Sequence, residues 1–484
     1  MRKKIHNILS TIIFLLLLNL FIFRATDILS AKNSVIKYHD MEKDEFDVLF
    51  FGSSHVINAV FPMELWNEYG IVSYNCGGHG NTLPTTYWML KNVLNQKKPE
   101  VVVIDVLGVE WNNRRRPERQ GVYQQHTSFD WQPMTKEKLG MMDFLLDTIE
   151  EKMEFIAPIT LYHDRWKELS REDFEIPYGK EKGAEYRSKR TVPNDFKLVS
   201  EDEMFQEDTL GKQYLCKMIK ECQERGIKVL LIQIPYPANE ESQKWGNSVE
   251  LIAKEYAVPY LNMFYEDVGV NFFTDCFDAD SHLNPSGARK VSKFLGKYLQ
   301  DNYLVLDRRG DALYESWEED YAEYKGMKWE ILKDAQKDPW TYLSLLQDEN
   351  LDVCLFFSGE SEMIYWGTPP KLVENIAELN CLQKASGEQK DYFMVADREQ
   401  GIVTEYIDLK SNSEIETSFG NIRYTSRNEN GVCGLFINGR EENYLLNSDG
   451  TMADIAAISF DRATGEMVDW VRFNSKQSMD VIAR

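Results

Sequence analysis

The chain opens with a long apolar run that follows directly on three cations. Residues 5–23 read IHNILSTIIFLLLLNLFIF, and Arg2-Lys3-Lys4 precedes them. As a helix this run would span about 28 Å, close to the hydrocarbon thickness of a bilayer, and cations on its N-terminal side favour a cytoplasmic N-terminus. We therefore expect residues 1–25 to be a transmembrane signal anchor of a single-pass cell-membrane protein with an extracytoplasmic body. A cleaved signal peptide is the alternative, although Leu29-Ser30-Ala31 makes a poor cleavage site.

The rest of the chain is acidic and has enough apolar residues to build packed cores. It contributes most of the 78 Asp and Glu residues, which outnumber 55 Lys and Arg and give a net charge of −23. That balance argues against a nucleic-acid partner, which requires basic surface. The seven cysteines are irregularly spaced, without a C-x-x-C pair, so we expect neither a disulfide framework nor a zinc site.

Short apolar runs alternate with helical segments over residues 46–305. The predicted strands are 47–51, 71–75, 101–106, 228–234 and 258–264, and the predicted helices are 62–69, 85–95, 210–225, 240–256 and 286–299. Continuous apolar runs are typical of buried parallel strands. The pattern therefore predicts an α/β domain with a mostly parallel sheet and helices on both faces. A juxtamembrane linker (26–45) precedes this domain, and a polar, aromatic-rich insertion (about 107–200) interrupts it.

The C-terminal part of the chain has a different character. A helical connector is expected over residues 306–345 and an all-β domain over 346–484, with turn signals such as Asn438-Gly439 between short strands. Those strands are expected at 353–357, 392–395, 402–407, 422–424, 434–437, 455–460 and 467–473. No histidine follows His282, so binding or scaffolding is the default role for this domain.

Two charged runs allow two interpretations each. Arg114-Arg115-Arg116 could grip an anionic substrate or lie in a solvated loop. Glu318-Glu319-Asp320 could hold a cation or form the wet face of a helix.

Two segments carry residues suited to nucleophilic catalysis. Gly52-Ser53-Ser54-His55 follows the first strand, at the edge where α/β sheets place ligands, and a serine hydroxyl needs a base to become a nucleophile. Residues 278–287, which read DADSHLNPSG, precede the last helix of the domain, and an aspartate close to His282 could orient its imidazole. Taken singly, the serine turn could merely cap a helix or hold phosphate, and Asp280 could merely cap a turn.

Together the two segments resemble the SGNH (GDSL-type) hydrolase superfamily, over roughly residues 46–302. The resemblance implies a three-layer α/β/α domain. It makes Ser54 the nucleophile, because Gly52-Ser53-Ser54 is similar to the Gly-Asp-Ser block. It makes His282, in the loop before the last helix, the base. Residues 75–82 (NCGGHGNT) are similar to the second block, so the backbone N–H groups of Ser54 and Gly80 are expected to form the oxyanion hole.

The sequence departs from the superfamily pattern at two places. The third block normally supplies an asparagine to the oxyanion hole, but the matching strand end reads Gly108-Val109-Glu110-Trp111. The last block is normally Asp-x-x-His, but residue 279 is alanine, so the triad acid must be Asp280 or Asp278. The Asp-x-His spacing resembles that of the membrane-associated alginate O-acetyltransferases of the same superfamily, which favours Asp280.

The anchor and the site together resemble those acetyltransferases and the D-alanyl-teichoic-acid protein D. The resemblance implies an extracytoplasmic serine esterase or O-acyltransferase acting on a cell-surface or exported polysaccharide. Its acyl donor would come by way of a membrane-bound O-acyltransferase. Short matches near Asn438-Gly439 and residues 458–461 faintly resemble the interleukin-like EMT inducer β-domain of glycan-associated proteins.

The main alternative is a catalytically inactive SGNH-fold surface protein that serves as a glycan-binding scaffold, in line with the missing third-block asparagine. We expect no cofactor, because Gly52-Ser53-Ser54 is not followed by the Gly-Lys-Ser/Thr of a Walker loop. We also expect no metal, because the seven histidines lack ligand spacing such as H-E-x-x-H.

Overall fold

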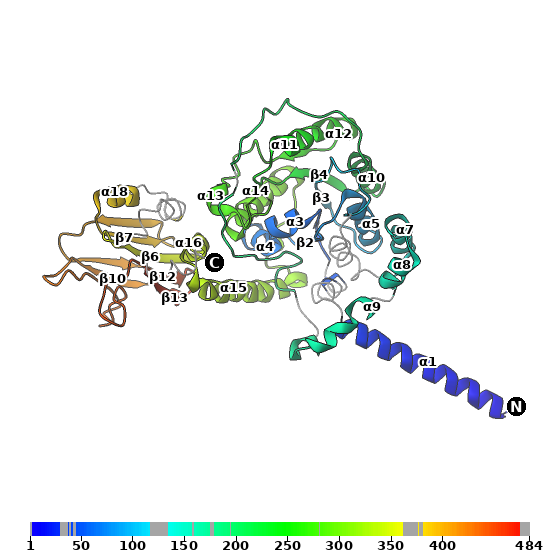
Figure 1. Ribbon diagram of the computed structural model, residues 1–484, viewed down its shortest axis with the longest axis horizontal. Coiled ribbons are helices and arrows are strands. Elements are labelled where there is room, and N and C mark those ends of the chain that lie inside the picture. The colour runs from blue at the N-terminus through cyan, green and yellow to red at the C-terminus, as the bar shows by residue number, and fades with distance from the viewer. Residues whose placement is uncertain are drawn as a thin grey trace.

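The structure is a computed structural model that describes residues 2–29, 37, 40–41, 45–116, 134–156, 159–174, 179–193, 195–279, 281–361, 376 and 381–474. Helix α1 (Arg2–Leu29) extends away from the body of the molecule (Figure 1). Within the described residues it is the one helix long and apolar enough to cross a membrane, over His6–Thr26. Its large apolar side chains between Ile8 and Ile22 are 40–70% exposed. The predicted linker over 26–45 lies mostly outside the described residues.

Five parallel strands form the sheet of the α/β domain, in the order β2-β1-β3-β4-β5. They are β1 (Val48–Phe51), β2 (Ser73–Asn75), β3 (Val101–Asp105), β4 (Lys228–Gln233) and β5 (Tyr260–Asn262). Because the strands are parallel, their C-terminal ends meet at one edge, where the predicted site residues follow β1 and β2. The predicted α/β class with a parallel sheet is confirmed.

Alternate residues of these strands enter two separate cores. Val48, Phe50 and Val103 pack with α3 (Ser54–Ala59), α4 (Pro62–Tyr69) and α14 (Pro285–Tyr303). Leu49, Phe51 and Ile104 pack with α5 (Leu83–Val93), α10 (Leu210–Glu224) and α12 (Val249–Tyr256). Since side chains alternate along a strand, continuous apolar runs bury both faces of the sheet.

The remaining helices of this part lie in the insertion and at the edge of the sheet. They are α7 (Lys136–Leu145), α8 (Ile149–Ile156), α9 (Ile159–Tyr162), α11 (Glu240–Asn247) and α13 (Phe272–Asp275), with 3-10 turns at His163–Lys167 and Arg171–Phe174. The single helix expected over 240–256 is two helices that meet at Ser248. The insertion is partly helical, and Met141, Met142 and Leu145 of α7 join one of the two cores.

Over residues 346–361 and 381–474, the C-terminal domain contains two antiparallel sheets and the helix α18 (Cys381–Glu388). One sheet has the order β13-β12-β6-β7-β8 and the other β11-β10-β9. The strands are β6 (Leu351–Phe357), β7 (Tyr392–Asp397), β8 (Ile402–Ile407), β9 (Ser413–Thr417), β10 (Gly420–Thr425), β11 (Gly434–Ile437), β12 (Ile455–Asp461) and β13 (Met467–Phe473). The domain is therefore β-rich as predicted, but α18 (Cys381–Glu388) packs on one face of the larger sheet, through Leu382 and Ala385.

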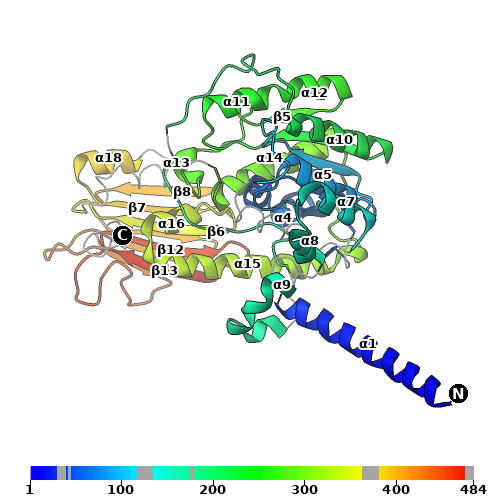
Figure 2. The same cartoon turned by 45° about the vertical axis from the view of Figure 1, so that its right-hand side comes forward.

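The predicted helical connector consists of α15 (Ser316–Asp334) and α16 (Pro339–Leu345), with 3-10 turns at Ala312–Tyr314 and Ala335–Lys337. Helix α15 runs from the α/β domain to the β-rich domain (Figures 1 and 2). Its Trp317 and Tyr324 join the core that contains Phe51, whereas Leu332 joins the core under β6. One helix thus belongs to both domains.

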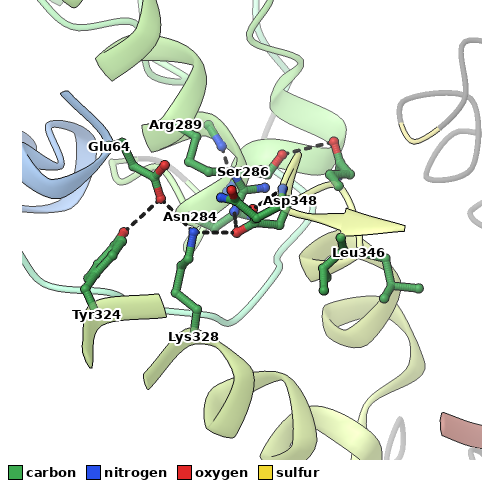
Figure 3. A network of polar contacts seen from close by, with 12 residues as sticks. Glu64, Asn284, Ser286, Arg289, Tyr324, Lys328, Leu346 and Asp348 are labelled. Carbon is green, nitrogen blue, oxygen red and sulfur yellow. Dashed lines mark hydrogen bonds and ion pairs between the residues drawn. The ribbon is translucent and has the colours of Figure 1, made fainter. Parts of the chain in front are cut away.

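A buried ion cluster joins the two domains (Figure 3). Lys328 Nζ of α15 lies 3.0 Å from Glu64 Oε1 of α4 and 2.9 Å from Asp348 Oδ2, just before β6. Arg289 of α14 also pairs with Asp348, at 3.1 Å. Two cations and two carboxylates balance each other, as buried charges must. Burial raises the pKa of Asp348, but the charges of Arg289 and Lys328 outweigh this effect and hold the pKa below its ordinary value.

The acidic run at 318–320 serves neither of its two predicted roles in full. Glu318 and Glu319 are exposed, as a wet helix face requires. Asp320 is buried and forms an ion pair of 2.6 Å with Lys182, a residue of the insertion whose side chain is fully buried. The third acid of the run therefore fastens the insertion to α15.

Candidate active site

The serine turn joins β1 to α3 through two residues, Gly52 and Ser53. Gly52 is required there, because a Cβ atom would lie 2.5 Å from Val56 Cγ2 and 3.0 Å from Asp105 Cβ. Ser53 is the N-cap of α3, and its Oγ accepts a hydrogen bond from the His55 backbone N–H. Ser54 is the first residue of the helix and is half-buried. The two serines thus have different roles, and that of Ser53 is to cap the N-terminus of α3.

Ser54 and His282 meet although 228 positions separate them in the chain. Ser54 Oγ lies 2.8 Å from His282 Nε2, and His282 Nδ1 lies 2.5 Å from Asp278 Oδ2. The order hydroxyl, imidazole, carboxylate is that of a nucleophile, a general base and the acid that orients the base. The structure therefore brings together the predicted Ser54 and His282.

The carboxylate at His282 is Asp278, where the sequence favoured Asp280. Asp280 itself lies outside the described residues. Asp278 Oδ1 accepts hydrogen bonds from the backbone N–H groups of Ser281 and His282, so the turn wraps around this carboxylate and aims its other oxygen at the ring. Burial raises the pKa of Asp278, but the hydrogen bonds and charge of His282 outweigh this effect and hold the pKa well below its ordinary value.

Asn284 closes the loop that carries His282. Its Oδ1 accepts hydrogen bonds from the backbone N–H groups of Ser286 and Gly287 and so caps α14, while its Nδ2 donates to the carbonyl oxygens of Thr274 and Cys276. Within the loop, Cys276 and Leu283 form an antiparallel bridge. The side chain therefore couples the start of α14 to the opposite end of the loop.

Two distant segments support the same loop from outside. From the insertion, the Arg190 guanidinium donates to the Phe273 carbonyl oxygen, and Thr191 Oγ1 donates to that of Phe277. From the connector, Ser344 Oγ donates to the Thr274 carbonyl oxygen. Ser286 at the start of α14 donates to Gln347 Oε1 at 3.0 Å. Sequence reasoning missed these contacts, because nothing in the chain marks them as neighbours of His282.

The second predicted block lies against the serine turn. The Gly52 carbonyl oxygen accepts hydrogen bonds from the Gly78 backbone N–H and from Asn81 Nδ2, both at 3.2 Å. Gly80 has a left-handed backbone with φ of +66°, which favours glycine. The Ser54 N–H belongs to the first turn of α3 and has no acceptor within that helix. The oxyanion hole formed by Ser54 and Gly80 remains a prediction.

Strand β3 ends in a buried acid, Asp105. Asp105 is 1% exposed. Neither oxygen of its carboxylate has a hydrogen-bond partner among the described residues. Burial raises the pKa of Asp105 to about 7, although the nearby backbone N–H groups of Ile234, Leu107 and Val106 lower it. A carboxyl group that is easily protonated therefore lies directly behind Gly52.

His55 is a further residue at the site that sequence reasoning quoted but gave no role. Its ring lies edge-on to His282, with centroids 5.3 Å apart, and to Tyr236, with centroids 4.6 Å apart. Burial first, and then the nearby His282, lower the pKa of His55 to about 3. A neutral imidazole thus packs against that of His282 without adding a competing charge.

A cavity of about 470 Å³ opens beyond Tyr236, next to the C-terminal ends of β4 and β5. Tyr236 contacts the ring of Phe264, which stacks on Phe196, and Phe196 in turn contacts Phe272. These three phenylalanines line the cavity, and Glu266 and Asp267 are exposed on its rim. A series of ring contacts therefore connects the His282 imidazole to an aromatic-lined space.

A scan against protein-family models found no match to this chain, and a search of curated proteins found none either.

Proposed function

We propose that this protein is a membrane-anchored, extracytoplasmic serine esterase or O-acyltransferase of the SGNH type that acts on a cell-surface or exported polysaccharide. The observation that carries the proposal is the hydrogen-bonded series Ser54–His282–Asp278, built at the C-terminal edge of a parallel sheet. Such a series gives a serine hydroxyl the base that it needs to attack an ester.

The geometry supports a two-step acyl transfer. His282 Nε2 accepts the proton of Ser54 Oγ as this oxygen attacks the ester carbonyl, and Asp278 stabilises the imidazolium that forms. The backbone N–H groups of Ser54 and Gly80 would hold the oxyanion. His282 then protonates the departing alcohol, which leaves an acyl-serine. A water molecule or a sugar hydroxyl, deprotonated by His282, attacks the acyl-serine and restores the free serine.

The location and partners are part of the same proposal. The exposed apolar surface of α1 supports membrane insertion, with the N-terminal cations in the cytoplasm and the body outside. A membrane-bound O-acyltransferase would then deliver the acyl group to this side. The aromatic cavity beyond Tyr236 supports a glycan substrate, because aromatic rings offer sugar rings a flat apolar face.

Labelling with a fluorophosphonate tests the nucleophile. The full-length protein in detergent micelles should react with the probe and hydrolyse p-nitrophenyl acetate, and Ser54→Ala should abolish both reactions. Ser53→Ala is the matched control from the same turn, because it removes the cap of α3 and leaves the Ser54 hydroxyl in place, and it should retain labelling. A folded wild-type protein that never reacts would favour the scaffold alternative, as would equal labelling of Ser54→Ala.

Addition of a glycan acceptor separates the two enzyme classes. A transferase should release p-nitrophenol faster when an oligosaccharide acceptor is present and should produce an acylated sugar, which mass spectrometry detects. A hydrolase should release acetate at a rate that does not depend on the sugar.

A further inference from the structure

The run Arg114-Arg115-Arg116 divides into two bound arginines and a third whose donors bind no residue that the structure describes. The Arg114 guanidinium donates to the Phe144 carbonyl oxygen at 3.0 Å and to Asp147 at 2.8 Å. Arg115 pairs with Asp147 at 3.2 Å and with Glu151 at 2.8 Å. Both therefore fasten the loop to the end of α7 and the start of α8, which is a structural role that neither sequence interpretation included.

Arg116 is half-buried and makes neither a hydrogen bond nor an ion pair with any residue that the structure describes. Its guanidinium carbon lies 4.1 Å from the ring centroid of Trp111. A guanidinium stacked on an indole gains a cation–π contact through its face, and this leaves the N–H donors in its plane available. The third arginine of the run is therefore held in place without being neutralised.

The platform under Arg116 is rigid. A Cβ atom on Gly108, whose φ is +87°, would lie 2.5 Å from Trp111 Cε3, so only glycine allows the indole to lie so close. The Trp111 backbone N–H donates to the Gly108 carbonyl oxygen at 3.0 Å, and its carbonyl oxygen accepts from the Gly211 N–H at 3.0 Å. Trp111 is thus fixed beyond the end of β3, the strand that pairs with β1.

One hydrogen bond and one electrostatic influence place this platform beside the candidate active site. Thr82, two positions after Gly80, donates a hydrogen bond from Oγ1 to the Arg114 carbonyl oxygen at 2.8 Å. The positive charge of Arg116 is among the influences that lower the pKa of His55, whose ring contacts His282. Glu110 also feels this charge, yet it forms no ion pair with Arg116.

We propose that Arg116, stacked on Trp111, binds an anionic group that the substrate carries close to its ester, a carboxylate or a phosphate. This subsite rests on the proposed esterase or acyltransferase function and narrows its substrate to an acidic polysaccharide or a phosphate-containing polymer. Carboxylate and phosphate oxygens match the planar donors of a guanidinium in a bidentate arrangement, and the indole edge lies next to the sugar that bears them.

A pair of esters that differ only in charge tests the subsite during turnover. The substrates are 4-acetoxybenzoate and its uncharged methyl ester, each assayed with the full-length protein. Wild type should prefer the anion, and Arg116→Gln should lower the ratio of the two kcat/KM values about ten-fold. Arg114→Gln is the matched control, since its side chain already pairs with Asp147, and it should keep the wild-type ratio. An unchanged ratio in Arg116→Gln would overturn the subsite.

Equilibrium binding distinguishes failure of the subsite from failure of the proposed function. An oligogalacturonate supplies carboxylates, a polyglycerol phosphate supplies phosphates, and a neutral dextran oligomer is the reference, each titrated by calorimetry into wild type and Arg116→Gln. Binding of one anion that weakens about ten-fold in the variant and fades at 1 M salt supports the subsite, even if neither ester is turned over. Equal affinity of wild type and the variant for both anions would refute it. Arg116→Lys, which keeps the charge and loses the fork, should bind with intermediate affinity.

Discussion

Both ring nitrogens of His282 form hydrogen bonds, one with Ser54 and the other with Asp278. Substitution of each of the three side chains therefore tests a different role. The ring nitrogen at Asp278 holds the tautomer, and the opposite nitrogen exchanges the proton. The residue that decides this arrangement is Asp278, because two backbone N–H groups fix its carboxylate before it meets the ring.

Asp278→Asn should therefore lower kcat strongly while leaving the fold intact. An amide cannot stabilise the imidazolium, and comparable substitutions in known triads cost about 10⁴-fold in kcat. The measurement is hydrolysis of p-nitrophenyl acetate by the full-length protein at constant pH. Asp280→Asn is the matched control from the same loop and should retain most of the activity. Equal losses in both variants would contradict the assignment.

Asp105 should make the stability of the α/β domain depend on pH. Its pKa is about 7 in the folded protein against an ordinary 3.8, so the folded state binds the proton more tightly than the unfolded chain does. The resulting stabilisation is complete below pH about 4 and is lost as the pH rises toward 7, with a size on the order of 4 kcal/mol.

Asp105→Asn keeps the shape of the side chain and removes the titration. The thermal midpoint of this variant should exceed that of wild type at pH 8, and the difference should shrink at pH 5. Asp267→Asn, at an exposed position, is the control and should track wild type at both values. A wild-type midpoint that is higher at pH 8 than the midpoint of Asp105→Asn would refute the role assigned to burial.

Helix α14 positions His282, the proposed general base, as well as covering the sheet. It begins at Pro285, and its capping residue Asn284 also donates hydrogen bonds to Thr274 and Cys276 at the far end of the loop. The helix itself packs through Val291, Leu295 and Leu299 against the parallel strands. Loss of the Asn284 side chain should therefore change the position of His282 more than it destabilises helix α14.

Asn284→Ala should slow fluorophosphonate labelling of Ser54 several-fold and destabilise the protein by about 1–3 kcal/mol, since both a cap and buried hydrogen bonds are lost. Asn239→Ala removes a comparable cap, that of α11, where the side chain accepts from the Ser242 N–H at 2.9 Å. It should cost about 1 kcal/mol and leave the labelling rate unchanged. If Asn239→Ala slows labelling as much, the effect is one of general stability.

The two domains form a continuous structure through α15, which contributes side chains to a core in each. Between those side chains Lys328 lies at the centre of the buried cluster with Glu64 and Asp348 (Figure 3). From this cluster Asp348 reaches Arg289 of α14, the helix that follows His282. The β-rich domain is therefore fastened to the same helix that positions the base.

Lys328→Met should destabilise the full chain by about 3–5 kcal/mol, because it leaves two carboxylates buried with one cation between them. Chemical denaturation followed by tryptophan fluorescence measures the change. Lys333→Met is the control five residues along the same helix, where the partly exposed lysine pairs with the exposed Glu330, and it should change stability by less than about 0.5 kcal/mol. If the two substitutions lower the free energy of unfolding equally, the buried cluster does not stabilise the junction between the domains.

Local pattern was sufficient for most elements and for two of the triad residues. The apolar run of β3 and the amphipathic α4 follow from their own residues, and Ser54 and His282 follow from the short motifs around them. The break at Ser248 was not predicted, and the close approach of Gly246 to Gln233 of β4, where a Cβ would be 2.8 Å from the Gln233 Oε1, is likewise not visible in the local pattern. The sequence left Asp278 and Asp280 open and favoured Asp280, because the path of the turn, and not the residue spacing, decides which carboxylate faces the ring.

By itself, the sequence determined the apolar helix at the N-terminus, the parallel α/β domain and the β-rich domain after it, because burial patterns repeat within a few residues and need no distant partner. Only the tertiary structure decided which acid faces His282, which segments hold its loop and which arginine has no polar partner among the described residues. Those outcomes depend on contacts between residues that are far apart in the chain, such as Ser286 with Gln347, 61 positions away, and Thr82 with Arg114, 32 positions away. Residue spacing does not record the distances in such contacts, whereas the packed fold sets them.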